Sequence, residues 1–215
     1  MKQILSLYNK CKKSDSIFFI VVIRLIFIKV FYKKTLFLHQ NVKIKGLKNI
    51  ESKGMILIGL NPVGFIHKTD KTYLNIQGKL IIKDDFSIGR GCRFDIGKNA
   101  IVELGSGSSI TCNTNLIIMH HLKIGDNCII SWDCQFLDSD FHEISYSGKK
   151  DINNSIIIGN NVWIGCGVKI YKGTVVSDGC VIASNSIVKG VFLDSNSLIG
   201  GNPAMIIKEK IEWKN

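Results

Sequence analysis

IGNNVWIGCGVKIYKGTVVSDGCVIASNSIVK, residues 158–189, carries an aliphatic residue at every sixth position. These positions are Ile158, Ile164, Ile170, Val176, Ile182 and Val188. Four places after each of the first five stands a small or β-branched residue: Val162, Val168, Thr174, Cys180 and Ser186. In an amphipathic helix, apolar residues recur at spacings of three and four. In an up-and-down sheet, apolar and polar residues alternate over long strands that hairpin turns connect. Period six with frequent glycine instead predicts short strands joined by tight turns, stacked as a β-solenoid with the aliphatic column inside.

The same period continues towards the N-terminus. A second run contains Leu104, Ile110, Leu116, Ile124, Ile130 and Phe136, with two extra residues before Ile124. Earlier turns begin at Ile88 and Ile96. Four of the seven cysteines fall at the small fourth position of a repeat: Cys92, Cys128, Cys134 and Cys180. A thiol there behaves as a compact hydrophobe, and the absence of a CxxC pair or a secretory signal is typical of a reducing cytosol.

Composition narrows the class of protein. The 215 residues are 46% hydrophobic and 21% charged, which is enough apolar surface for a core and excludes a mainly disordered chain. The formal net charge of +11 would suggest a polyanion partner if it were spread over the whole fold. Residues 1–50, however, hold eleven basic residues against Asp15 alone, so the basic character belongs to the N-terminal segment. We therefore expect no nucleic-acid partner.

Residues 17–31, IFFIVVIRLIFIKVF, are apolar at thirteen of fifteen positions. The run is shorter than the roughly 20 residues that a spanning helix needs, and Arg24 and Lys29 nearly cancel its insertion energy, so we do not expect it to span. A cleaved signal peptide is disfavoured because charges interrupt the apolar run. Two interpretations stay open: a helix lying on an anionic cytoplasmic leaflet, and a helix capping the solenoid core.

Three segments make the chain resemble the hexapeptide-repeat acyltransferases, in their sugar and xenobiotic O-acetyltransferase branch. They are IGNNVWIG at 158–165, IASNSIVK at 182–189 and GNPAMIIK at 201–208. The resemblance implies an all-β fold, a left-handed parallel β-helix with three hexads per coil, assembled as a homotrimer. We expect a helical segment at residues 1–40, the β-helix at 41–192 and a C-terminal strand or helix tail at 193–215.

The hexad phase is lost in a loop at residues 137–157. Loops that interrupt a solenoid commonly carry its function. This loop contains Asp138, Asp140 and His142 as D-x-D-x-H, a base near two carboxylates that could orient and polarise it. The resemblance implies that His142 is the general base, although the family usually has proline where Glu143 stands. The alternative is a solvated loop histidine.

The resemblance also implies a site for acetyl-CoA, the acyl donor. Trp163 would lie beside the donor groove, and the backbone N–H of Cys166 would face the thioester carbonyl and stabilise its oxyanion. Four further residues match positions along the pantetheine arm and near the nucleotide phosphates: Ser184, Asn185, Lys189 and Lys208. The alternatives are that Trp163 has only a structural role and that Lys189 and Lys208 are solvated surface charges.

Asn113 and Asn115 lie one coil before the loop and are candidates for contacts with an acceptor sugar, or for an asparagine ladder within the solenoid. His120 and His121 with His142 could be interpreted as a zinc site of the γ-carbonic-anhydrase kind. The two histidines five residues apart that mark that family are absent, so we expect no metal.

The sequence thus predicts an acetyl-CoA-dependent O-acetyltransferase acting on a sugar hydroxyl, in capsular or lipopolysaccharide O-antigen synthesis. We expect a cytoplasmic homotrimer with peripheral membrane contact through residues 1–40. The alternatives are N-acetylation of an amino-sugar nucleotide, a trimeric solenoid scaffold without activity, and the metal protein.

Overall fold

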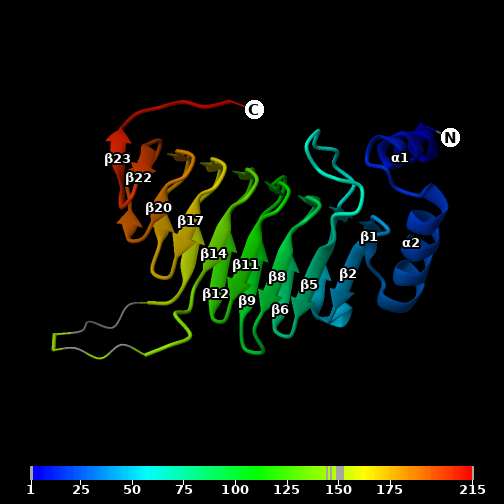
Figure 1. The fold of residues 1–215 in the computed structure, drawn as a ribbon, viewed down its shortest axis with the longest axis horizontal. Coiled ribbons are helices and arrows are strands. Elements are labelled where there is room, and N and C mark those ends of the chain that lie inside the picture. Colours follow the sequence, from blue (N-terminus) through cyan, green and yellow to red (C-terminus); the bar gives the residue numbers. More distant parts are fainter. Residues whose placement is uncertain (1, 144, 146, 149–152, 215) are drawn as a thin grey trace.

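The computed structural model describes residues 2–143, 145, 147–148 and 153–214. Short strands wind into a three-sided prism, visible as a row of coils between the N-terminal helices and the C-terminal strands (Figure 1). Through most of the prism, successive strands enter three sheets in turn, so each strand pairs in parallel with the one three places before it. The fold is the left-handed parallel β-helix that the resemblance to the hexapeptide-repeat acyltransferases implied.

The elements are assigned as follows. Sheet A contains β1 (Thr35–Leu38), β4 (Met55–Ile58), β7 (Phe86–Ile88), β10 (Ser109–Ile110), β13 (Ile129–Ile130), β16 (Trp163–Ile164), β19 (Val181–Ile182), β22 (Leu198–Gly201) and β23 (Ala204–Lys208). Sheet B contains β2 (Val42–Lys45), β5 (Thr72–Ile76), β8 (Arg93–Ile96), β11 (Asn115–Ile118), β14 (Gln135–Leu137), β17 (Lys169–Tyr171) and β20 (Ile187–Val188). Sheet C contains β3 (Ile50–Ser52), β6 (Lys79–Ile82), β9 (Ile101–Leu104), β12 (His121–Ile124), β15 (Ile156–Ile158), β18 (Val175–Val176) and β21 (Val191–Phe192). The helical elements are α1 (Lys2–Lys13), α2 (Phe18–Tyr32) and the 3-10 turn η1 (Leu47–Asn49).

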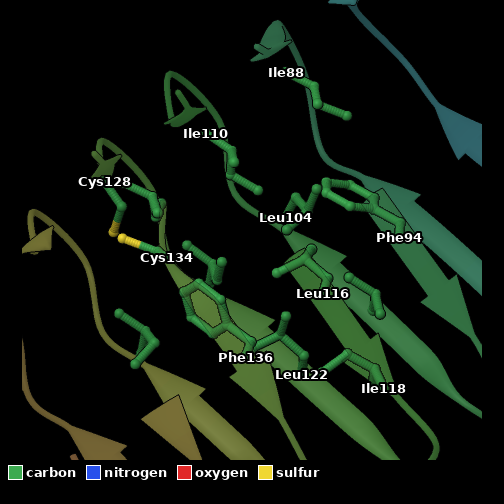
Figure 2. Close-up of a cluster of buried hydrophobic side chains, with 14 of the residues drawn as sticks. Ile88, Phe94, Leu104, Ile110, Leu116, Ile118, Leu122, Cys128, Cys134 and Phe136 are labelled. Atoms are coloured by element: carbon green, nitrogen blue, oxygen red, sulfur yellow. The ribbon is translucent and has the colours of Figure 1, made fainter. Parts of the chain in front are cut away.

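The aliphatic column lies inside the prism, as the hexads predicted. All six aliphatic positions of residues 158–189 are buried to 1% exposure or less, and so are the five positions four places on. Figure 2 shows side chains of all three sheets pointing toward one another, among them Ile110 from sheet A, Leu116 from sheet B and Leu122 from sheet C. One residue from each side of the prism thus closes each layer of the core.

The four cysteines predicted at the small position are buried and carry free thiols. Burial raises the pKa of Cys92 and Cys134 to about 12 and that of Cys128 to about 11. These thiols therefore stay protonated and pack as apolar groups.

The N-terminal helix α2 caps the first coil. Its Ile28 belongs to the same buried cluster as Leu36 and Leu38 of β1, which confirms the capping interpretation. The solenoid strands begin at Thr35 and continue to Gly201, beyond the expected range of 41–192 at both ends. No helix among the described residues is long and apolar enough to cross a bilayer.

The C-terminal end is closed differently. Strand β23 turns back and pairs antiparallel with β22, the last strand to join the sheet by the parallel pattern. The chain then runs back over sheet A, where the Ile211 N–H donates to the Asn196 carbonyl (2.8 Å). The described part of the expected tail thus consists of strands and extended chain.

Candidate active site

The loop of residues 137–157 leaves the prism at the corner between sheets B and C, after β14, and rejoins it at β15 (Figure 1). Asp138 fixes its first residues. The Asp138 side chain is fully buried, and its carboxylate accepts the backbone N–H groups of Met119 (2.7 Å), His120 (2.7 Å) and His121 (3.0 Å). Hydrogen bonds to an ionised acceptor are among the stronger ones in proteins, so Asp138 ties the loop firmly to the coil before it.

Asp140 ties the loop to the coil that follows. Its carboxylate forms an ion pair with the Lys172 ammonium group, 2.6 Å away, at the turn between β17 and β18. His142, two residues further along the loop, is exposed. The structure thus places the D-x-D-x-H residues together on one loop, with Asp138 bonded to the preceding coil and Asp140 paired with Lys172 of the following coil.

His120 and His121 lie beside the root of the loop and have separate partners. The His121 ring lies 2.9 Å from a Glu103 carboxylate oxygen, and the His120 ring lies 3.3 Å from the Asn154 amide. Among the described residues, no group of three potential ligands is placed to hold a metal ion.

The residues expected to contact the donor gather mostly at another corner, between sheets A and B. The Cys166 carbonyl accepts the Asn185 N–H (2.9 Å), and the Cys166 thiol lies 3.3 Å from the Ser184 hydroxyl. No described hydrogen bond uses the Cys166 N–H, so within this chain it is available to a ligand. Gly167 has a φ of 69°, and a β-carbon there would lie 2.3 Å from the Asn185 amide oxygen, so a side chain at position 167 is disfavoured.

Trp163 points outward from sheet A and is 42% exposed. Its indole N–H donates to the Ser131 hydroxyl (3.3 Å), and its ring packs against Trp213 with a centroid distance of 6.1 Å. Trp213 in turn donates to the Asn161 carbonyl (3.0 Å). Sequence reasoning missed Trp213, because the tail has no hexad phase and nothing else marked this residue.

The other residues predicted to bind the donor or the acceptor are spread over several parts of the prism. Lys189 is exposed at the corner between sheets B and C, and Lys208 is exposed at the end of β23. Asn113 has a φ of 57°, and its amide oxygen would lie 2.0 Å from a β-carbon on Gly91 of the preceding coil. Asn115 begins β11, between Arg93 and Gln135 in register, and is half-buried.

One chain therefore holds the two halves of the predicted site at different corners. The loop with His142 leaves at the corner between sheets B and C, whereas Cys166, Ser184 and Asn185 lie at the corner between A and B. The B sheet separates them. A base and an oxyanion donor must both lie about 3 Å from the reacting atoms, so this separation bears directly on how a site could form.

Residues 155–190 match the family model described as "Bacterial transferase hexapeptide (six repeats)". The chain is 39% identical over 217 residues to an "Uncharacterized 24.8 kDa protein in cps region" of Klebsiella pneumoniae, covering 100% of this chain and 97% of that one. It is similar to the structure of the polySia-specific acetyltransferase NeuO, with 26% identity, a TM-score of 0.51 and 84% and 89% of the two chains covered. The polysialic acid O-acetyltransferase OatWY gives 21% identity, a TM-score of 0.58 and coverage of 85% and 88%, a likeness of fold.

Proposed function

The chain belongs to the hexapeptide-repeat acyltransferases, and from this membership we propose that it transfers an acetyl group from acetyl-CoA to a sugar hydroxyl in surface polysaccharide synthesis. The observation that carries the proposal is the loop with His142, which is anchored at both adjoining coils and projects an exposed imidazole. NeuO, which shares this fold at 26% identity, is an acetyltransferase specific for a polysaccharide. The Klebsiella relative of the cps region supports a role in capsule synthesis.

In the proposed reaction His142 acts as general base. It accepts the proton of the acceptor hydroxyl while that oxygen attacks the thioester carbonyl carbon. The new C–O bond forms, the C–S bond breaks, and CoA leaves as the thiolate. The Cys166 N–H donates to the oxyanion of the tetrahedral intermediate, which agrees with its being unused within the chain. No covalent acyl-enzyme is required.

Asp138 and Asp140 serve this reaction as positioning residues. Their partners are the backbone of the preceding coil and Lys172 of the following one, so they set where the loop leaves the prism. A loop held at its root keeps His142 within a restricted volume, and a misplacement of about 1 Å can cost about 10² in rate.

On the donor side we propose that Trp163 borders the groove and that Ser184 and Asn185 contact the pantetheine arm. The exposed ammonium groups of Lys189 and Lys208 suit the nucleotide phosphates. We propose that Asn115, on the outer side of β11, and Asn113 contact the acceptor sugar.

We propose a homotrimer, because the two halves of the site lie at different corners of one prism. In a closed threefold assembly, the loop of one copy can reach the A–B corner of the next. The acyl donor is a cytoplasmic metabolite, so we place the protein in the cytoplasm, with peripheral membrane contact through residues 1–40.

The test is acetyl transfer by the purified full chain. Acetyl-CoA is mixed with deacetylated capsular oligosaccharides, with sugar nucleotides or with amino-sugar nucleotides, and free CoA thiol and product mass are followed. We expect CoA release and a base-labile ester with an oligosaccharide or sugar acceptor. An alkali-stable amide on an amino-sugar nucleotide would replace O-transfer with N-transfer, and failure to bind acetyl-CoA would favour the scaffold.

A further inference from the structure

The outer face of α2 is apolar along its whole length. Besides Tyr32 at its last position, seven of its residues are large, apolar and at least 36% exposed: Phe19, Ile20, Ile23, Ile26, Phe27, Val30 and Phe31. At 3.6 residues per turn they fall within an arc of about 140°, and no charged residue of α2 falls inside it. We name these seven residues the outer stripe. Soluble proteins rarely expose contiguous apolar patches of more than a few hundred Å², and larger patches mark interaction sites.

Arg24, which would oppose membrane contact, points away from this face. Its guanidinium group donates to the carbonyls of His39 (2.8 Å) and Val42 (2.7 Å) at the first coil. Val21 and Ile28 are buried on the same inner side. The helix therefore turns its one arginine and a narrow apolar strip inward, and its wider apolar strip outward.

The charges around the outer stripe are mostly basic, with Asp15 as the one acidic residue of residues 1–50. Lys29 is exposed about 60° around the helix from the stripe, Lys33 directly follows α2, and Lys12 and Lys13 end α1, seven and six residues before Phe19. The sequence contains no Asp or Glu between residues 16 and 50. Aromatic contacts extend the apolar surface towards α1, because the rings of Tyr8, Phe18 and Phe19 pack in series at centroid distances of 5.7 Å.

We propose that the outer stripe docks on an anionic membrane surface. A helix with an exposed apolar face and flanking lysines lies in the headgroup plane, with its apolar side chains below and its ammonium groups at the lipid phosphates. A second copy of the chain fits this face less well, because it would bring two sets of lysines together with Asp15 as the one carboxylate of residues 1–50 in each copy.

The position of α2 makes this docking compatible with the rest of the fold. The helix packs on β1 at the N-terminal end of the prism, far along the row of coils from β22 and β23 (Figure 1). Contact through the outer stripe leaves both corners with the predicted site residues uncovered. The proposal goes beyond acetyl transfer and does not depend on it.

The experiment is co-sedimentation of the full chain with vesicles of phosphatidylcholine alone, or of phosphatidylcholine and phosphatidylglycerol at about 3:1. One variant carries Phe19→Gln and Ile23→Gln, which are 74% and 66% exposed. Its matched control carries Leu193→Gln and Val191→Gln, which are 71% and 61% exposed near the opposite end. A third variant carries Lys12→Gln and Lys29→Gln.

We expect the parent chain to partition at least about tenfold better to the anionic vesicles, and each α2-directed variant to lose about tenfold, whereas the control keeps the parent value. High salt should weaken the parent's binding. Circular dichroism and acetyl transfer without vesicles check that every variant is folded. Equal partition of parent and Phe19→Gln/Ile23→Gln chains, or an equal loss in the control, would overturn the proposal. A larger solution mass for the parent than for that variant, without lipid binding, would assign the stripe to a second copy instead.

Discussion

His142 and Asp138 stand four residues apart and have opposite surroundings. The His142 side chain is exposed, whereas Asp138 is buried and bonded to three backbone N–H groups. The spacing D-x-D-x-H predicted that the three residues share one loop. It could not predict that Asp138 binds backbone, because the N–H groups that it meets belong to residues 119–121, which the fold brings close and the sequence does not mark.

The exposed position of His142 makes its removal a test of chemistry alone. We expect His142→Ala to lower the rate of acetyl transfer by about 10² to 10⁴, because a general base contributes that much. The melting temperature should stay the same. His67→Ala, another exposed histidine, is the matched control and should keep full activity. Activity within a factor of a few of the parent for His142→Ala would direct attention to His120 or His121.

A substitution of Cys166 distinguishes a catalytic role of its thiol from a role of its backbone N–H. The proposed mechanism uses its N–H, so Cys166→Ala should keep kcat within a factor of about three, since alanine retains that donor. The thiol contact with Ser184 is peripheral to the proposed reaction. Steady-state kinetics with acetyl-CoA measure the effect. A fall of kcat by 10² or so, with a covalent acetyl adduct on the parent chain, would establish a nucleophilic cysteine and contradict the mechanism.

At the scale of elements, the six-residue repeat identified the strands wherever one repeat forms one side of the prism. From Ile158 to Val188 every predicted inward position is buried. The first coils were harder to recognise, because residues 59–71 separate β4 from β5 and interrupt the repeat. There the chain keeps its three sides but loses the constant spacing that a search for repeats needs.

Strand β17 provides a test of the inward column within one element. Ile170 is fully buried, while its neighbour Lys169 points outward and is exposed. We expect Ile170→Asp to prevent folding, because an unpaired buried carboxylate costs several kcal/mol against a total stability of about 5–15 kcal/mol. Lys169→Asp, the control in the same strand, should fold and melt within a few degrees of the parent. Thermal unfolding followed by circular dichroism decides, and a folded Ile170→Asp chain would refute the hexad phase.

At the scale of the whole molecule, the candidate site is divided between two corners of the prism. The sequence predicted the loop and the donor segment separately, and it carried no direct signal of their separation across sheet B. That separation follows from the order in which the strands enter the three sheets. β14 and the loop belong to the B–C corner, whereas Cys166 and Ser184 belong to the A–B corner. An assembly that brings unlike corners together would complete the site without any change of fold.

Mixed assemblies test this division. His142→Ala removes the base from one half of the site, and Ser184→Trp places a large side chain at the exposed A–B corner to block the donor half. Each variant alone should be folded and inactive. If each site joins the loop of one copy to the corner of the next, every mixed trimer has one of its three sites built from an intact loop and an intact corner, so doubly tagged trimers regain about one third of the sites. If the site lay within one chain, every chain would carry a defect and mixing would restore nothing. Co-expression of the two differently tagged variants, purification through both tags and measurement of acetyl transfer per site therefore distinguish a shared site from a single-chain one.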